Sequence, residues 1–346
     1  MQWYKSKKAT LLITFFLLLM NVNQAALAST AVTRTEKKQI QTFLNKSNAN
    51  VMVLVNGPHS KQPVRIQHST VAKDSPQYIT ENKLFPIGST QKMLTGMLVL
   101  RAIKAHKLSF NTKLSKYYPQ VPNSKQITVR ELLTHTSGLA DKSRFSDQPL
   151  SDQQAQLNYS ISHLSSSGGH GWIYASVNYA LLAGILSKVY HESYAELVNN
   201  YYLAPNDLHQ AKFYYQVQSP QDVLGTGMLA GNQQSHWHHI KRQLSTYLGA
   251  GDMLISPANY WVIVTQAFNT HRPLFEEIMH AKVAPDSHYF AGGYVRDGIL
   301  HSNGTVEGYT CNVFTNGKQT MMLFSNSMSS KDTDALSGQV AKVYFK

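Results

Sequence analysis

The stretch "FPIGSTQKMLTGMLVLRA", residues 85–102, places a serine and a lysine three positions apart at the head of an apolar run. The pattern predicts a helix over 89–107. Residues i and i+3 share one face of a helix, so Ser89 and Lys92 are expected to lie side by side. Lysine is rarely buried unless it is paired, so a lysine on this apolar helix needs a chemical explanation.

Two explanations of the pair stand at this point. A serine hydroxyl needs a base within hydrogen-bond reach to act as a nucleophile, and burial lowers the pKa of a lysine because it disfavours the charged form. Lys92 would then accept the proton of Ser89, whose N–H at the helix N-terminus helps to hold an oxyanion. Alternatively, Ser89 only caps the helix and Lys92 reaches the surface.

The N-terminal segment has the pattern of a secretory signal peptide. Lys5, Lys7 and Lys8 precede an apolar run over 9–22, and Ala26-Leu27-Ala28 supplies small residues before a cut at Ser29. The sequence therefore predicts a signal peptide over 1–28 and a mature chain over 29–346. The alternative is a retained segment that anchors the chain in the membrane.

Charge and cysteine content limit the function classes. The formal net charge is +13, and the three signal lysines account for three of those charges. A secreted chain with a net charge of +10 is expected to meet anionic envelope polymers and acidic membrane surfaces, whereas an exported protein rarely meets nucleic acid. The basic residues read as dispersed along the chain. Cys311 is the only cysteine, so no internal disulfide is expected, which favours the envelope of a Gram-positive bacterium.

Hydrophobic periodicity predicts strands near both chain ends and helices between them. Thr128 and Glu131 form a capping box at the start of one helix, and Asn316-Gly317 marks a hairpin. The predicted helices cover 33–47, 89–107, 127–139, 178–205, 257–268 and 332–345, and the predicted strands cover 50–57, 63–70, 289–298, 308–314 and 319–326.

This order indicates an α+β fold. An antiparallel sheet built from both chain ends and flanked by helices would carry a separate all-helical lobe made from the middle of the chain. No linker or repeat interrupts residues 29–346, so we expect one two-lobed domain. The active site is expected in the cleft between the two lobes.

The surroundings of Ser89 and Lys92 are similar to those in a known superfamily. The segments are "LFPIGSTQKMLTGMLVLRAIKAHKLSFNTKLSKYYP", "ITVRELLTHTSGL", "WIYASVNYALLAGILSKV", "YLAPNDLHQAKFYY", "GAGDMLIS" and "GGYVRDGILHSNGTVEGY". In this order they resemble the serine β-lactamase and penicillin-binding superfamily, in the branch of class C β-lactamases, D-alanyl-D-alanine carboxypeptidases and related esterases. The resemblance implies the two-lobed fold, with Ser89 as the acylated nucleophile and Lys92 as its basic partner.

The second motif of the superfamily, usually Tyr-x-Asn, reads Tyr174-Ala175-Ser176 here. The resemblance implies that the phenol of Tyr174 passes a proton to the leaving group. Ser176 stands where an asparagine would orient both the lysine and a substrate amide. A serine hydroxyl is shorter and makes fewer hydrogen bonds, which argues against β-lactam hydrolysis and strict peptide specificity.

The third motif, usually Lys or His followed by x and Gly, aligns with Ser302-Asn303-Gly304, and His301 comes one residue early. Either the cationic position has become Ser302, or the strand is shifted and His301 fills it. The resemblance implies that this position meets a substrate carboxylate, so its change argues against substrates that end in one. Thr305 would supply the second oxyanion N–H.

Other histidines are interpreted as structural. His135 belongs to "THTSG", and the sequence has no Gly-x-Ser-x-Gly elbow to pair it with a serine nucleophile. The segment "HWHH", residues 236–239, is expected in a solvent-facing loop without a metal. No metal or organic cofactor is expected.

The leading hypothesis is a secreted or surface-bound serine hydrolase that removes D-alanine from an ester on teichoic or lipoteichoic acid. The first alternative is a D-alanyl-D-alanine carboxypeptidase acting on peptidoglycan stem peptides. The second is a catalytically weak wall-binding protein that keeps the fold. The net positive charge and the altered second and third motifs favour the ester, whose leaving group is an alcohol on an anionic polymer.

Overall fold

The computed structural model describes residues 31–57, 62–142, 145–225, 233–270, 272–281 and 287–345. The predicted signal peptide over 1–28 and the membrane anchor that is its alternative lie outside these residues. Within the described ranges, no helix combines the length and the apolar character needed to cross a membrane.

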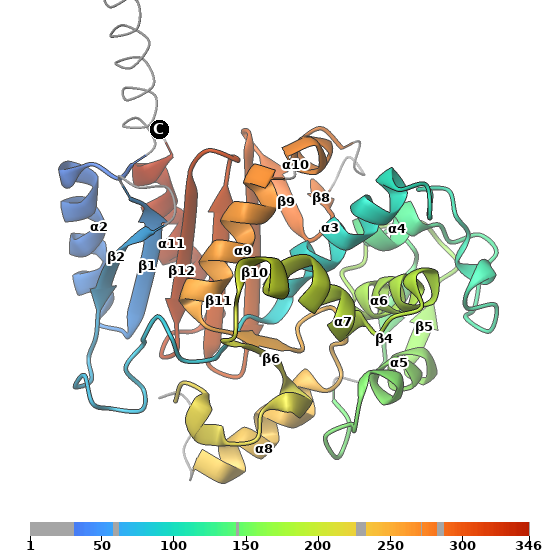
Figure 1. Cartoon of the computed structure of the whole chain (residues 1–346), viewed down its shortest axis with the longest axis horizontal. Helices are drawn as coiled ribbons and strands as arrows, with labels where there is room; N and C mark the ends of the chain where they lie inside the picture. The colour runs from blue at the N-terminus through green and yellow to red at the C-terminus, as the bar shows by residue number, and fades with distance from the viewer. Residues whose placement is uncertain are drawn as a thin grey trace, which may run out of the picture.

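A seven-stranded antiparallel sheet forms one side of the molecule, in the order β2-β1-β12-β11-β10-β9-β8. The N-terminal strand β1 lies between β2 and β12, so both chain ends build the sheet, as the sequence predicted (Figure 1). Two short sheets, β3-β7-β6 and β4-β5, lie outside it. The strands are β1 Val51–Asn56, β2 Pro63–His68, β3 Phe85–Pro86, β4 Leu139–Asp141, β5 Leu164–Ser166, β6 Ala211–Phe213, β7 Met253–Ile255, β8 Tyr289–Phe290, β9 Gly293–Arg296, β10 Ile299–Val306, β11 Tyr309–Thr315 and β12 Thr320–Ser325.

Helices cover both faces of the sheet and build a lobe beside it. In Figure 1 the lobe of α3 to α7 stands to the right of the sheet, while α2 and α11 lie at the opposite end. This arrangement confirms the predicted α+β fold with a helical lobe. The helices are α2 Arg34–Ser47, α3 Gln91–Lys104, α4 Val129–Thr134, α5 Gln153–Ser162, α6 Ser176–Tyr190, α7 Tyr194–Val198, α8 Gln233–Leu244, α9 Pro257–Thr270, α10 Arg272–Met279 and α11 Ser330–Tyr344.

Alternation along the strands divides the hydrophobic core into two parts. Val53 of β1 and Leu323 of β12 pack against α2 and α11, whereas Leu54 and Met322 point to the opposite face and join the larger core with α9 and α3. Successive residues of a strand point to opposite faces, so each central strand serves both cores. The larger core continues into the helical lobe and holds the two parts together.

Several predicted boundaries were wrong. The helix predicted over 178–205 ends at Tyr190, where His191 takes a left-handed conformation, and α7 restarts after the cap Ser193. The helix predicted over 127–139 ends at Thr134, although its capping box is present as predicted. The segment 236–239 lies in α8 with Trp237 buried, and not in a solvent-facing loop.

Candidate active site

Ser89 lies in a short 3-10 turn, Gly88–Thr90, that precedes α3. The sequence predicted it inside the helix itself. Gly88 has a φ of +52°, a left-handed conformation that glycine adopts without strain. A Cβ atom on Gly88 would lie 2.8 Å from the backbone nitrogen of Thr305. The turn therefore packs directly on β10, which only a glycine allows.

Lys92 occupies the first turn of α3 and is fully buried, as the hypothesis of a desolvated base required. Its Nζ donates hydrogen bonds to Ser89 Oγ and to the backbone oxygen of Ala250, both at 2.9 Å. Burial lowers the pKa of Lys92 to about 7, because the charged amine loses its hydration, and the nearby Asp141 carboxylate opposes this shift. Near neutral pH a large fraction of Lys92 is therefore unprotonated and can accept a proton from Ser89.

The glycine-rich bend before β7 holds the carbonyl of Ala250 in place. Asp252, fully buried in this bend, accepts hydrogen bonds from Gln91 at 2.7 Å, Gln156 at 3.1 Å and the N–H of Gly249 at 3.1 Å. Burial raises the pKa of Asp252 to about 7. Sequence reasoning gave this aspartate no role. Its only signal was the segment "GAGDMLIS", which does not reveal contacts with α3 and α5.

Tyr174, just before α6, contacts Ser89 through its hydroxyl. Its side chain is 39% exposed, but its hydroxyl interacts with the side chains of Ser89 and Tyr289. Burial of that hydroxyl end raises the pKa of Tyr174 to about 12, so the phenol keeps its proton at neutral pH. The buried ring of His135 supports it: the ring centroids are 4.4 Å apart, and His135 Nδ1 accepts the N–H of Ala175 at 3.2 Å.

Ser176 is the first residue of α6 and lines a pocket of 460 Å³ together with Tyr174 and Asp141. The Asp141 carboxylate accepts the backbone N–H groups of Ser176 at 2.7 Å and Val177 at 3.0 Å. Asn178, two residues farther on, does not replace the missing asparagine. It is fully buried and bonds to Ser137 and to the ring of the supporting histidine.

Strand β10 presents Ser302 and Gly304 to the side where Ser89 lies. A Cβ atom on Gly304 would come 2.8 Å from the backbone nitrogen of Ser89. The backbone nitrogen of Thr305 lies beside the same turn. The backbone nitrogens of Ser89 and Thr305 therefore both lie where the turn packs on β10, and we propose their N–H groups as the donors to an oxyanion of an acylated serine. Ser302 is 2% exposed, and its hydroxyl donates to the backbone oxygen of Gly292 at 2.7 Å.

His301 faces away from the nucleophile. Its ring stacks on Phe314 with centroids 4.1 Å apart, and its Nε2 lies 2.9 Å from Asn312 Oδ1. Asn303 shares this face and donates to Asp334 of α11 at 3.2 Å. Because alternate residues of a strand point to opposite faces, the third-motif position toward Ser89 is filled by Ser302. The alternative that His301 fills it does not agree with this geometry.

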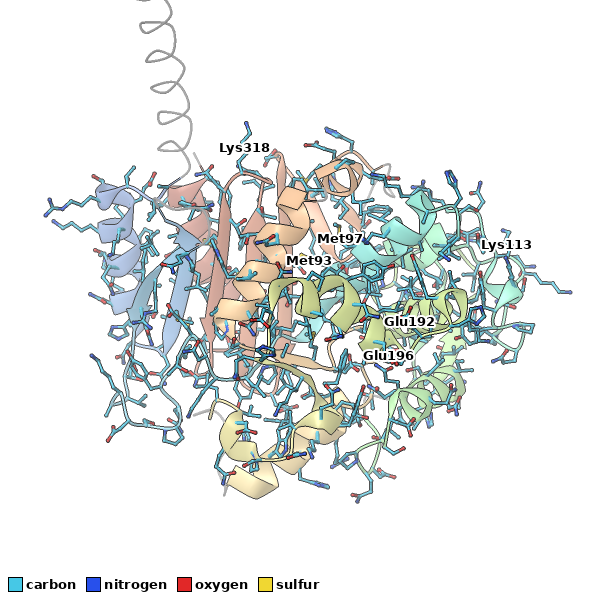
Figure 2. All side chains as sticks on the ribbon, in the orientation of Figure 1. Met93, Met97, Lys113, Glu192, Glu196 and Lys318 are labelled. Carbon is cyan, nitrogen blue, oxygen red and sulfur yellow. The ribbon has the colours of Figure 1, made fainter. Side chains whose placement is uncertain are left out.

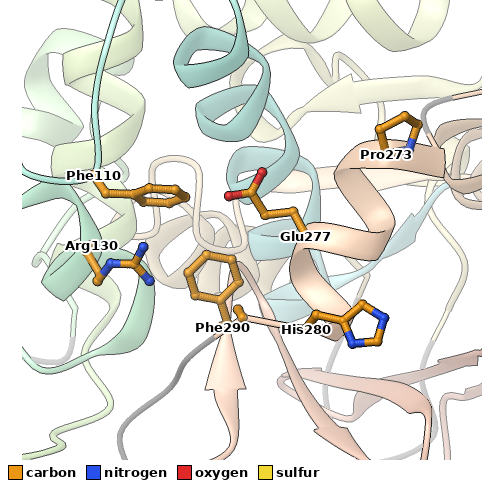
Figure 3. A pocket seen from close by; sticks show the side chains of 7 residues that line it. Phe110, Arg130, Pro273, Glu277, His280 and Phe290 are labelled. Atoms are coloured by element: carbon orange, nitrogen blue, oxygen red, sulfur yellow. The ribbon is translucent and has the colours of Figure 1, made fainter.

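A pocket of 710 Å³ elsewhere contains none of these residues. Phe110, Arg130, Pro273, Glu277, His280, Ala281 and Phe290 line it (Figure 3). The smaller pocket of 460 Å³ is lined by Tyr174, whose hydroxyl interacts with Ser89, so this pocket is the candidate active site. In the described part of the chain, no group of three or more histidine, cysteine, aspartate or glutamate side chains is arranged to hold a metal ion.

Comparisons with known proteins agree with this geometry. A model of the β-lactamase family matches residues 38–272. The chain belongs to this family. It is therefore a member of the serine β-lactamase and penicillin-binding superfamily, in its class C-like branch, and it is a serine hydrolase of that superfamily.

Individual relatives cover most of the chain. A teichoic acid D-alanine hydrolase of Staphylococcus aureus is 28% identical over 301 residues, which make up 84% of this chain and 73% of that protein. The crystal structure of FmtA from Staphylococcus aureus has a TM-score of 0.73 at 23% identity and covers 90% of this chain and 87% of that one. D-amino acid amidase from Ochrobactrum anthropi SV3 also has a TM-score of 0.73, at 18% identity, and covers 90% and 99%.

Proposed function

We propose that the protein hydrolyses D-alanyl esters on an anionic polymer of the cell envelope, through an acyl-enzyme on Ser89. The observation that carries this proposal is the buried third-motif position. Ser302 offers no cation to a substrate carboxylate, and its hydroxyl is already bonded to Gly292. A D-alanyl ester has no such carboxylate. The relative named as a teichoic acid D-alanine hydrolase supports the same substrate class and a place at the cell surface.

The acylation step follows from the contacts around Ser89. Lys92 accepts the proton of the hydroxyl as Oγ attacks the ester carbonyl. The N–H groups of Ser89 and Thr305 stabilise the oxyanion that forms. The C–O bond to the polymer then breaks, and Tyr174 gives a proton to the departing alkoxide.

Deacylation reverses the proton movements. Lys92 first gives the proton that it took from Ser89 to the Tyr174 phenolate, which restores the phenol and the neutral amine. A water molecule then attacks the acyl-serine, and neutral Lys92 takes up one of its protons. The bond between the acyl carbon and Ser89 Oγ breaks as Lys92 passes that proton to Oγ, so the serine regains its hydroxyl and D-alanine leaves. These steps use side chains and backbone groups of this chain alone, with Lys92 held by Ala250 throughout.

The test compares the purified protein with its Ser89→Ala variant on two substrates. D-alanylated lipoteichoic acid and a muropeptide ending in D-Ala-D-Ala are supplied separately, and free D-alanine is quantified. We expect release from lipoteichoic acid that depends on Ser89 and little release from the muropeptide. Release from the muropeptide alone would establish a carboxypeptidase instead.

A fluorescent penicillin and a fluorophosphonate probe distinguish the remaining alternative, a wall-binding protein with weak catalysis. The wild type should be labelled by the fluorophosphonate, and the Ser89→Ala variant should not. If neither probe labels the wild type and no D-alanine is released, the wall-binding alternative replaces the esterase.

A further inference from the structure

Positive charge is concentrated in one continuous part of the sequence. Residues 82–130 contain no aspartate or glutamate. The same 49 residues contain nine lysines and arginines, of which Lys92 is the buried base at Ser89. The other eight lie just before β3, on α3, in the segment between α3 and α4, and on α4: Lys83, Arg101, Lys104, Lys107, Lys113, Lys116, Lys125 and Arg130. The prediction of dispersed basic residues therefore does not hold for this part of the chain.

The fold gathers three of these residues around one open hollow of 510 Å³. Lys113, Lys125 and Arg130 line it together with His170 and Glu131, and we call it the cationic hollow. Both lysines are exposed. Lys113 Nζ donates to the backbone oxygen of Gln126 at 2.8 Å, which fixes one ammonium group at the rim.

Among the residues that line the cationic hollow, one carboxylate, Glu131, stands against the three cations Lys113, Lys125 and Arg130, so a net positive charge remains. Glu131 is occupied: its Oε2 accepts both the N–H and the hydroxyl of Thr128 at 2.7 Å, and its Oε1 lies 2.5 Å from His170 Nδ1. Among the described residues, Lys113 and Lys125 have no carboxylate within salt-bridge distance.

Arg130 connects the cationic hollow with the pocket of Figure 3. Its guanidinium lies 4.1 Å from the ring centroid of Phe110, which holds it flat against the lobe. In Figure 3, Glu277 projects into this neighbouring pocket from α10. Glu277 does not line the cationic hollow itself. The positive charge of the hollow therefore rests chiefly on the two exposed lysines.

The cationic hollow lies close to the mouth of the active site. His170 precedes Tyr174 by four residues, a path of at most about 14 Å for an extended chain. The backbone N–H of Ile173 donates to the backbone oxygen of His135 at 2.8 Å, which ties this segment to the helical lobe. Trp172 lies between the two sites and is 39% exposed, with its ring 6.5 Å from that of Tyr174.

We infer that the cationic hollow binds the phosphodiester backbone of the polymer and thereby brings its D-alanyl esters to Ser89. Lysine ammonium groups bind phosphates as point charges, without a fixed geometry. Such contacts suit a flexible chain of regularly spaced negative charges that must slide between cleavage events. The inference rests on the proposed function for its substrate, but the binding it describes is measurable without hydrolysis.

The experiment measures binding in the Ser89→Ala background, where the polymer stays intact. Lys113→Gln/Lys125→Gln is compared with the control Lys318→Gln/Lys342→Gln, which removes the same charge. Figure 2 labels Lys113 and Lys318 on opposite sides of the molecule, and Lys342 lies on α11, at the end of the sheet away from the helical lobe. With lipoteichoic acid as ligand, we expect affinity to fall about 5- to 20-fold for the first pair and less than 2-fold for the control, with a weaker salt dependence for the first pair only.

Hydrolysis separates this inference from the proposed function. With Ser89 intact, the Lys113→Gln/Lys125→Gln variant should lose about 5-fold or more of kcat/KM on the polymer and keep that on a D-alanyl glycerol ester. If both double variants weakened binding of the polymer equally, the effect would come from the net charge of the protein and not from the cationic hollow. That result would overturn the inference. Loss of binding to anionic lipid vesicles without loss for the polymer would also overturn it. If the protein releases D-alanine from no substrate, but the Lys113→Gln/Lys125→Gln variant still loses affinity for the polymer as expected, then the proposed function is wrong and the binding inference stands.

Discussion

Lys92 and Ser302 are both buried polar residues at positions that the superfamily motifs assign to the active site. Lys92 keeps a free lone pair in its neutral form, and its partners are the nucleophile and one backbone carbonyl. The hydroxyl of Ser302 has one hydrogen to donate, and it donates this hydrogen to the backbone oxygen of Gly292. Neutral Lys92 can therefore accept a proton, whereas the hydroxyl of Ser302 is buried and already bonded within the protein.

The difference indicates which part of the superfamily's chemistry this chain keeps. The side chains that we propose as nucleophile, base and proton donor, Ser89, Lys92 and Tyr174, are in contact with one another. The positions that meet the rest of the substrate, Ser176 and Ser302, carry short hydroxyls instead of an amide and a cation. On the proposed function, the chain therefore keeps the groups that break the bond and differs from the superfamily pattern at the positions that recognise the substrate; one fold can serve several substrates in this way.

Replacement of Lys92, the proposed base, is expected to have the largest effect on activity. Lys92→Met keeps the apolar stem and removes the amine that contacts Ser89 Oγ, so the proposed proton acceptor is lost. We expect kcat for D-alanine release to fall by about 10³-fold. Lys104→Met, on the exposed end of the same helix, is the matched control and should stay within 2-fold. Retention of more than a tenth of the activity by Lys92→Met would refute its role as base.

Loss of the ring under Tyr174 should have the next largest effect. His135 has a φ of +58°, a conformation that asparagine tolerates, so His135→Asn preserves the backbone while it removes the stacked ring. We expect kcat on the ester to fall about 10- to 50-fold because the phenol is less well placed to protonate the leaving alcohol. Labelling by a fluorophosphonate, whose fluoride leaves without strong acid assistance, should fall less than 3-fold. An equal loss in both measurements would indicate a purely structural role.

Removal of the Asp141 charge should shift the pH dependence in a defined direction. The carboxylate favours protonated Lys92, so Asp141→Asn is expected to lower the pKa of Lys92 further below about 7. The active form is neutral Lys92, and kcat/KM of the wild type should rise with pH through about 7. The rising limb of the variant should lie at lower pH by a few tenths of a unit, a small shift because Asp141 is exposed to solvent. A shift toward higher pH would contradict the assigned electrostatics.

The sequence predicted the large elements and the first motif because both depend on local patterns. The capping box of Thr128 and Glu131, the hairpin at Asn316 and the two strands that it joins, β11 and β12, are all present. These signals act over a few residues, where periodicity and turn chemistry decide the structure. The predicted pairing of Ser89 with Lys92 depends on the same short range, and it holds although Ser89 lies just before the α-helix.

Features that depend on distant contacts could not be predicted. The short strand Met253–Ile255 forms only because it pairs with β3 and β6, and a glycine-rich bend gave no strand signal. The support of Lys92 by Ala250 joins residues 158 positions apart. The choice between His301 and Ser302 required the register of β10 against β11, since a shift by one residue exchanges the two faces of a strand.

The smallest effect is expected at Ser302, and it tests the contrast with Lys92 most sharply. Ser302→Ala removes the donor to the Gly292 oxygen and should cost about 1–2 kcal/mol of unfolding free energy, because a buried carbonyl is left without a partner. Ser337→Ala is the matched control: Ser337 is also fully buried and donates to the backbone oxygen of Asp334 at 2.9 Å, in α11. Both variants should lose similar stability and keep D-alanyl ester hydrolysis within 3-fold of the wild type. If Ser302→Ala alone lost 10-fold or more of kcat/KM while its stability matched that of the control, Ser302 would contact the substrate. The contrast between Lys92, which is available for proton transfer, and Ser302, which is closed off from the substrate, would then be wrong.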